Sequence, residues 1–290
     1  MITKTGKLKS LLTIFVPMLI AINVDAQKPV IEWANIPAGT FTMGSPVTEE
    51  GRDTNETQHQ VTLSAFKMSK YEITVGQFKA FVDATGYKTE AEIKTYGYNE
   101  SEIWTGKKHK YKKGVNFRCD VKGKLRPATD YNQPVIHVSW NDAVAFADWM
   151  GCRLPTEAEW EYACRAGTTT TFNTGDSLTV SQANFNGNFS NTTNEKGEFR
   201  EKTLPVGSFS PNAWGIYDMH GNVVEWCSDW DGDYPEGSQT NPKGAATGSY
   251  RVFRGGSWFV GANPCRSACR LSVEPIYRCS VIGFRLVSPE

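Results

Sequence analysis

The chain has 290 residues, with 31 lysines and arginines against 31 aspartates and glutamates, and 39% of its residues are hydrophobic. A formal net charge of zero excludes a protein held mainly on nucleic-acid phosphates or acidic lipid, so we expect no nucleic-acid partner. The 26 glycines, 14 prolines and 9 tryptophans are typical of a globular chain rich in turns and large aromatic side chains. They exclude a coiled coil or a helical bundle.

The first 26 residues have the pattern of a signal peptide. Lys4, Lys7 and Lys9 form a basic start, and the apolar run over residues 11–22 is shorter than the about 20 residues of a membrane span. Small residues up to Ala26 predict cleavage after it. We therefore expect an exported protein, periplasmic, in the cell envelope or secreted, with no stable membrane span after cleavage. A short membrane anchor is the alternative.

Residues 27–290 are expected to form one domain, because no Ser/Gly linker, acidic tail or repeat interrupts them. Alternating apolar residues predict strands over 39–44 and 61–68. Three helices are predicted from capping residues: they begin after Thr74, Ser139 and Thr156, each with a capping-box partner three residues later, and end near Gly86, Gly151 and Gly167. The later chain has Gly, Asn, Pro and aromatic residues in short runs. The predicted fold class is α+β with low regular secondary structure and much coil.

Residues 93–132 are expected to be a loop insertion between the first two helices. A cluster of lysines in it would suit an anionic partner, but a charge run on a loop is usually a solvated face. We therefore expect these side chains to be exposed. They are Lys107, Lys108, Lys110, Lys112 and Lys113.

The histidines do not indicate a zinc hydrolase. None has the i,i+4 spacing with an intervening Glu that such a site needs, and His137 lies in an apolar run that favours a core position. A nucleophile elbow, a phosphate loop and a dinucleotide fingerprint are also missing from the sequence. The common hydrolase and nucleotide chemistries are therefore excluded.

The seven cysteines leave at least one without a partner inside the chain. A thiolate at Cys265 or Cys269 beside Arg266 and Arg270 would have a lowered pKa and would serve as a nucleophile or soft-metal ligand. The alternative is a disulfide from Cys164 to Cys265 or Cys269, which export favours. The two hypotheses are compatible, since one cysteine can be bonded and the other free.

The segment from Asp218 to Glu225 has two carboxylates seven residues apart with a Gly-Asn turn between them. Such a loop can aim several oxygen atoms at one point, as calcium requires. Its spacing lacks the alternating carboxylates of an EF-hand. The alternative is a turn held by Asn222, with Glu225 as a capping residue.

Several segments together resemble the formylglycine-generating enzyme family, also called the sulfatase-modifying factor domain. The resemblance spans nearly the whole mature chain and implies the family's variant of the C-type lectin-like fold, with bound calcium. The matching segments are Ile36–Gly44, Val138–Ala143, Arg153–Tyr162, Gly215–Asp218, Gly221–Trp226, Arg254–Trp258 and Gly283–Arg285.

Enzymes of this family oxidise a sulfatase cysteine to formylglycine with dioxygen and a copper(I) ion held by two cysteines. Counting forward from Ser257, the two ligand positions are Val260 and Cys265. Counting back from Gly283, this loop is about three residues shorter than the enzyme's, so Cys265 lies near the ligand position and not at it. The resemblance thus implies an incomplete copper site, with Cys265 and Ser257 as the catalytic candidates.

The resemblance also implies disulfides and calcium ligands. Ala147 and Leu286 stand where the enzymes have one disulfide, and Cys164 would pair with Cys265 or Cys269 in the other. One calcium site would use Asp218, Gly221, Val223 and Glu225. A second would use Asn184 and the carbonyl of Phe185, with Glu198 as a further candidate.

Three functions follow as hypotheses. The first is an exported domain that keeps the fold and binds a protein or peptide, either sulfatase-like or an envelope component, without a complete copper site. The second is an active formylglycine-generating oxidase with an altered site built on Cys265 and Ser257. The third is a different iron- or copper-dependent oxidation, which usually comes with a His-rich helical domain that this sequence lacks.

Overall fold

The computed structural model describes residues 1–2, 28–93, 100–189 and 197–288. The predicted signal peptide and its cleavage site lie outside these ranges, apart from the first two residues. None of the helices in the described ranges has the length and apolar character that crossing a membrane requires.

The three predicted helices are present as α1 (Val75–Thr85), α2 (Trp140–Met150) and α3 (Glu157–Arg165). Each begins with the predicted capping box, in which the cap side chain and the side chain three residues later bond to each other's backbone. The first two helices end at the predicted glycines. The third ends slightly earlier than predicted, because Ala166 takes the left-handed conformation (φ 46°) that closes the helix.

In the described part of the chain the strands form four small sheets, and the strands predicted at residues 39–44 and 61–68 are confirmed as β2, β3 and β4. The central sheet has four strands in the order β10-β9-β7-β11, and a second sheet has the order β2-β3-β8. The bounds are β1 Trp33–Ile36, β2 Gly39–Met43, β3 His59–Leu63, β4 Phe66–Ser69, β5 Glu100–Trp104, β6 His109–Lys113, β7 Val224–Trp230, β8 Gln239–Thr240, β9 Arg251–Arg254, β10 Arg270–Val273 and β11 Ile282–Gly283, with short 3₁₀ helices at Ala128–Asp130 and Asn263–Cys265.

The core has two main parts on either side of the central sheet's strands. Helices α1 and α2 bury Phe78 and Phe146 against Phe284, with the first two rings 5.6 Å apart. Ala147 and Leu286 are buried in the same apolar cluster. Apolar packing therefore occupies the place where the resemblance implies a disulfide in the enzymes.

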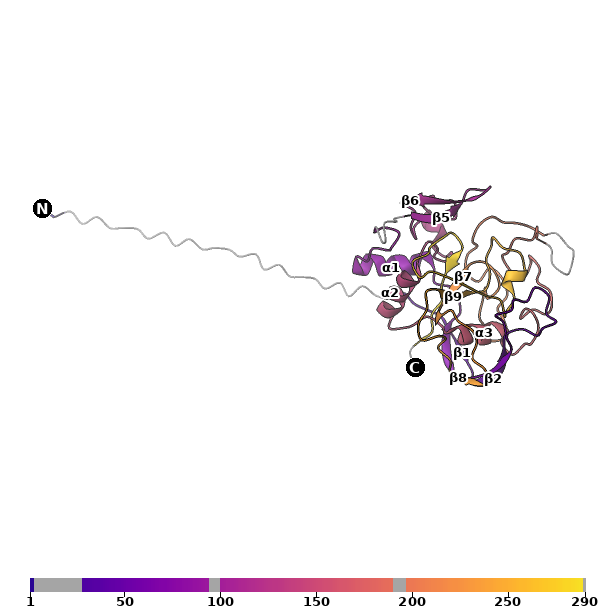
Figure 1. The fold of residues 1–290 in the computed structure, drawn as a ribbon. Coiled ribbons are helices and arrows are strands. Elements are labelled where there is room, and N and C mark those ends of the chain that lie inside the picture. The colour runs from indigo at the N-terminus through magenta and orange to yellow at the C-terminus, as the bar shows by residue number, and fades with distance from the viewer. Residues whose placement is uncertain (3–27, 94–99, 190–196, 289–290) are drawn as a thin grey trace.

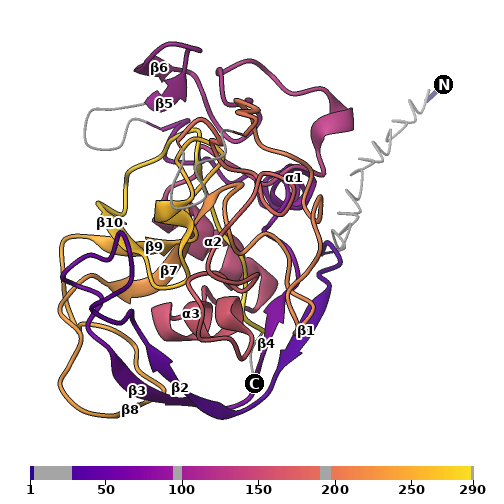
Figure 2. The same ribbon diagram turned by 90° about the vertical axis from the view of Figure 1, so that its right-hand side faces the viewer.

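Helix α3 lies in the second part of the core, between the β2-β3-β8 sheet and the central sheet (Figures 1 and 2). Its residues are all buried, including the charged ones. Because a buried helix with charged side chains needs partners for each of them, α3 becomes the centre of the ion-pair network described below.

Residues 93–132 were expected to be a loop insertion, but they also contain two paired strands. Strands β5 and β6 pair antiparallel and form a hairpin at the end of the molecule opposite β2, β3 and β8 (Figures 1 and 2). Cross-strand pairs such as Glu100 with Lys113 and Trp104 with His109 stabilise it. Every residue of β6 is exposed, which confirms the solvated lysines of that strand.

Candidate functional site

The candidate site is the loop that joins β9 to β10, residues 255–269. It begins with Gly255 and Gly256, whose φ angles of 99° and 68° favour glycine. A Cβ atom on Gly256 would lie 2.4 Å from the Cys265 sulfur, so the turn packs directly on this thiol. Ser257 is also buried, and its hydroxyl accepts a 3.4 Å hydrogen bond from the Phe259 amide. The two catalytic candidates therefore lie close together but inside the protein.

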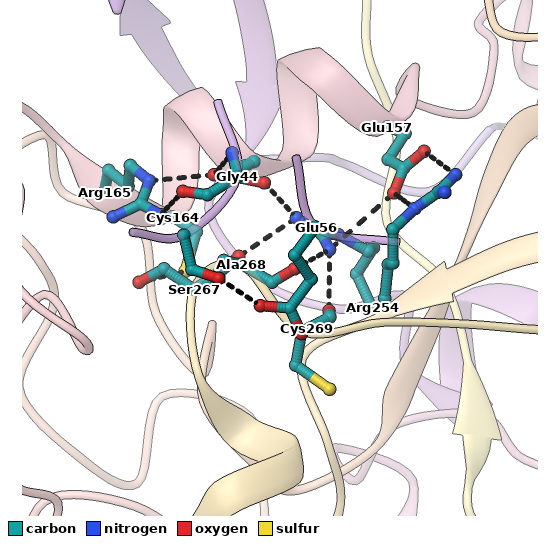
Figure 3. Close-up of polar contacts among 12 residues, drawn as sticks. Gly44, Glu56, Glu157, Cys164, Arg165, Arg254, Ser267, Ala268 and Cys269 are labelled. Atoms are coloured by element: carbon teal, nitrogen blue, oxygen red, sulfur yellow. Dashed lines mark hydrogen bonds and ion pairs between the residues drawn. The ribbon is translucent and has the colours of Figure 1, made fainter. Parts of the chain in front are cut away.

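Arg254 holds the far end of this loop in place (Figure 3). Its guanidinium donates hydrogen bonds to the carbonyls of Ser267 (3.0 Å), Ala268 (2.8 Å) and Cys269 (2.6 Å), and it pairs with the Glu161 carboxylate. The side chain is almost completely buried. A single cation thus replaces the backbone partners that the irregular loop lacks.

The network continues along α3. Glu161 also accepts from Arg165 at 2.9 Å, and Glu157 accepts two hydrogen bonds from Arg270, at 2.8 and 2.9 Å. Arg254 lies 3.7 Å from Glu157 and links the two halves. Two helix carboxylates therefore fix the residues on both sides of the β9–β10 loop, through charged hydrogen bonds in a water-poor interior.

Arg266 ties the same loop to the N-terminal part of the chain. It donates to Glu49 at 2.6 Å, to Glu56 at 2.7 Å and to the Gly51 carbonyl at 2.7 Å. The local sequence does not predict these glutamates, because nothing in residues 46–56 indicates that they meet a loop more than 200 positions later.

A cavity of about 520 Å³ lies beside Arg266. Asn263 and Glu49 also line it, and exposed Glu50 and Asp176 stand at its edge. Because Glu49 and Glu56 already neutralise Arg266, the uncompensated charges at this cavity are acidic.

The cysteines do not have the reactivity that the sequence suggested. Arg266 and Arg270 are engaged by carboxylates, and burial raises the pKa of Cys265 well above its ordinary value and that of Cys269 to about 11. Cys265 is 0% exposed, and its thiol donates to the Gly261 carbonyl at 3.5 Å. The prediction of a lowered thiol pKa was wrong, since burial outweighs the nearby cations.

All seven cysteines, which all lie in the described ranges, are free, so the expected disulfide from Cys164 is not formed in this structure. The Cys164 sulfur lies 3.7 Å from the Ser267 hydroxyl and 3.8 Å from Nε2 of His220. Nδ1 of that histidine lies 2.7 Å from the Cys265 carbonyl, which only accepts, so Nδ1 carries the proton. Burial lowers the pKa of His220 to about 4, which keeps the ring neutral.

His137 is the core histidine that the sequence predicted. It is fully buried, and its Nε2 donates to the Asp120 carbonyl at 3.0 Å while Nδ1 lies 2.8 Å from the Ser101 hydroxyl. Burial lowers its pKa to about 4. The partners of its ring, Asp120 and Ser101, both lie outside the β9–β10 loop.

The predicted calcium carboxylates lie in different surroundings: Asp218 is half-buried and Glu225 is fully buried. Asp218 accepts from the Gly207 amide at 2.6 Å, and burial raises its pKa to about 6. Both oxygens of Glu225 are used by Arg285, at 2.6 and 2.8 Å, and one also accepts from the Trp160 indole. Glu225 is therefore neutralised by a cation of the protein itself.

A third carboxylate, Glu72, completes this cluster and was missed by the sequence analysis. It is buried, it accepts from the Asn222 side chain at 3.1 Å, and its pKa is raised by burial and by the nearby charges of Asp218 and Glu225. Glu72 lies just before the first helix, where no sequence pattern indicates a calcium ligand.

The second predicted calcium segment meets the first. The Asn222 amide donates to the Asn184 carbonyl at 2.8 Å, and a Cβ atom on Gly221 would lie 2.4 Å from that oxygen. Phe185, next in the chain, packs its ring in an apolar cluster with Cys265. Glu198 is mostly exposed and pairs with Arg200, so it does not join this group.

The cluster fits a calcium ion in part. Buried Glu72 and Glu225 and half-buried Asp218 face one guanidinium, that of Arg285. The side-chain oxygen of Asn184 is buried without a hydrogen bond. In the described ranges, however, no three His, Cys, Asp or Glu side chains converge as a metal site. Calcium would therefore depend on backbone carbonyls, such as those of Gly221 and Val223, beside Asp218 and Asn184.

Comparison with known proteins agrees with this architecture. The chain is 37% identical over 276 residues to the formylglycine-generating enzyme of Mus musculus, covering 86% of this chain and 73% of that protein. It is 37% identical over 280 residues to the formylglycine-generating enzyme of Streptomyces coelicolor, covering 86% and 87%. The solved structure of PvdO from Pseudomonas aeruginosa superimposes with a TM-score of 0.71 at 30% identity, covering 90% of this chain and 95% of that one.

Residues 21–289 match the sulfatase-modifying factor enzyme 1-like domain. The predicted α+β class and the lectin-like variant are confirmed by the few helices, the short strands and the likeness to PvdO. The chain therefore belongs to the formylglycine-generating enzyme, or sulfatase-modifying factor, family.

Proposed function

We propose that this chain is an exported domain of the family that binds a protein or peptide segment and does not oxidise it. The basic and apolar start of the sequence supports export, and the 520 Å³ cavity beside Arg266 supports binding. The observation that carries the proposal is the burial of Cys265, packed against Gly256 and Gly261, with Val260 at the other ligand position.

Two-thiolate coordination of copper(I) explains why this burial matters. The metal binds thiolates, so each ligand must lose its proton, and a raised thiol pKa opposes this. Val260 supplies an alkyl group, and the hydroxyl of Ser257 is too hard a ligand to replace a sulfur. Cys265 alone therefore does not make a copper(I) site.

The cavity favours a basic partner segment. Glu50 and Asp176 are exposed at its edge, while Arg266 inside it is already paired. A lysine or arginine side chain of the partner would gain two carboxylates without displacing an internal ion pair. We propose a sulfatase-like protein or an envelope component as the source of this segment.

We also propose that calcium stabilises the fold through Asp218, Glu72 and Asn184, with the carbonyls of Gly221 and Val223. The surplus negative charge and the unbonded Asn184 oxygen support this part of the proposal. Glu225 would act indirectly, by neutralising the charge of Arg285 that would otherwise repel the ion.

One experiment tests binding and oxidation together. A fluorescent Cys-x-Pro-x-Arg peptide is titrated with the purified protein, and then incubated with copper(I) and oxygen and examined for aldehyde by mass spectrometry. We expect saturable binding without aldehyde, and no aldehyde from V260C, because the shorter loop misplaces the pair. The double variant E50Q/D176N should bind several-fold more weakly, and E236Q, which removes an exposed carboxylate elsewhere, should bind like the wild type.

An active oxidase is the second candidate, favoured by the 37% identity to two formylglycine-generating enzymes over most of the chain. Aldehyde formed with turnover and abolished in C265S would establish that function and overturn the first. Absence of both peptide binding and aldehyde would leave neither function standing for this class of peptide.

A further inference from the structure

A second cavity, of about 260 Å³, lies away from the β9–β10 loop, between the N-terminus of α3, the end of β7 and the loop over residues 232–245. Asp229 forms part of its wall and is only 3% exposed. Tyr234, Trp230 and His59 supply aromatic surface around it. The cavity thus combines the buried carboxylate of Asp229 with the aromatic rings of its lining. This combination suits an organic cation, whose charge pairs with the carboxylate while its carbon atoms contact the rings.

Within the described residues, Asp229 is hydrogen-bonded through only one of its two carboxylate oxygens. Its Oδ2 accepts from the Glu157 amide at 2.9 Å and from the Ser228 hydroxyl at 3.0 Å, and no hydrogen bond to Oδ1 is formed within the described ranges. Neighbouring Glu157 is neutralised by Arg270, whereas Asp229 forms no ion pair with a lysine or arginine of the described residues. Burial and the charge of Glu157 raise the pKa of Asp229 to about 7, and they outweigh the opposing charge of Arg251, which acts on this carboxylate without forming an ion pair.

The cations around this carboxylate are engaged elsewhere. The guanidinium of Arg251 is stacked between two tryptophan rings, 3.7 and 3.4 Å from their centres, and donates to the Ser228 carbonyl at 2.6 Å. Arg270 is held by Glu157 and by the Gly232 carbonyl. Lys243 is exposed where it lines the cavity.

The loop over the cavity approaches the carboxylate closely. A Cβ atom on Gly244, at φ 72°, would lie 2.8 Å from Oδ1 of Asp229. Any side chain at this position would clash with Asp229, so the loop packs tightly beside the carboxylate. The small volume of the cavity limits the ligand to one short chain.

We propose that this cavity binds a primary ammonium group on a short alkyl chain, as in a lysine side chain, with the ammonium on Oδ1 of Asp229. The alkyl part would lie against Tyr234 and Trp230. A compact ammonium with three donors suits an oxygen in so small a space better than a planar guanidinium does. The site is independent of the cavity beside Arg266 and of any oxidase activity.

The probe is n-butylammonium chloride, titrated at pH 8 into the ¹⁵N-labelled full chain and followed by two-dimensional NMR. We expect saturable shifts at the amides of Asp229, Tyr234 and Gly244. Sodium chloride at equal ionic strength and 1-butanol should not reproduce them. D229N keeps the acceptor roles of this side chain and should weaken binding at least tenfold, whereas K243Q should tighten it several-fold by removing a like charge.

Three results would overturn the assignment. They are equal affinity in D229N, equal shifts with 1-butanol, and no saturable shift with butylammonium. Should D229N fail to fold, K243Q decides, because this residue is exposed: unchanged or weaker binding there would contradict an electrostatic site.

Discussion

At the scale of single residues, buried charges decide how the β9–β10 loop is held. Arg254, Glu161 and Glu157 lie inside the protein, where an unpaired charge is costly, so each is matched by partners. This pairing explains why the loop keeps its shape with little regular structure. It also explains why the arginines next to the cysteines do not activate them.

Removing one carboxylate of this network should destabilise the protein strongly. E161Q leaves Arg254 and Arg165 without their shared charge in a buried place, and we expect a loss of about 3–5 kcal/mol in the free energy of unfolding. E32Q, which breaks an exposed pair with Lys70, is the control and should change it by less than about 0.5 kcal/mol. Urea denaturation measures both, and similar losses in the two variants would contradict the network.

His137 should make the fold sensitive to acid. Its folded-state pKa of about 4 lies below the ordinary value of 6.5, so the unfolded state binds the proton more readily. Its contribution is complete above pH 6.5 and is lost as the pH falls towards 4.

The substitution H137N removes this titration, and asparagine tolerates the positive φ of 61° at this position. Between pH 7.5 and pH 5 the wild type should lose about 2 kcal/mol more stability than H137N. Urea midpoints at several pH values measure the difference, and parallel curves for the two proteins would argue against the effect.

At the scale of elements, the helices are specified locally. Each capping box lies within four consecutive residues, so the start of each helix can be predicted from the local sequence, while packing of its apolar face supplies most of its stability. The insertion was harder to predict, because its hairpin depends on the cross-strand pairing of β5 and β6. Charged and aromatic residues alternate there without a clear apolar face.

The N-cap of α2 gives a test at this scale. S139A removes the acceptor for the Asp142 amide, 3.1 Å away, and we expect a loss of about 1–2 kcal/mol because the cap is fully buried. D148A, on the exposed face of the same helix, should be neutral within about 0.5 kcal/mol. Thermal and urea unfolding provide the comparison. An unchanged S139A protein would show that the cap is not a stabilising contact.

At the scale of the whole molecule, segments far apart in the chain meet at the proposed calcium cluster. Glu72, Asn184 and Asp218 come from three different parts of the sequence. Asn222 hydrogen-bonds Glu72 and Asn184, and the charge of Asp218 acts on Glu72. An ion there would link the region before α1 to the loops before β7. Its removal is therefore expected to loosen the fold as a whole.

Chelation should lower the melting temperature. A ligand at 100 times its dissociation constant stabilises the native state by about 2.7 kcal/mol, and an excess of chelator removes that contribution. D218N should reduce the response to calcium, while E198Q, at an exposed carboxylate paired with Arg200, should respond like the wild type. A melting temperature that neither calcium nor chelator changes would exclude a stabilising ion.

The sequence by itself determined the features that depend on neighbouring residues or on family motifs: the three capped helices, the first strands, the α+β class and the core position of His137. Only the tertiary structure decided the state of the site. The burial of Cys265, the pairing of Arg266 with Glu49 and the place of Glu72 depend on contacts between segments tens to hundreds of residues apart. A thiol pKa or an ion pair is set by the solvent and charges around the group, and those neighbours are fixed only when the chain has folded.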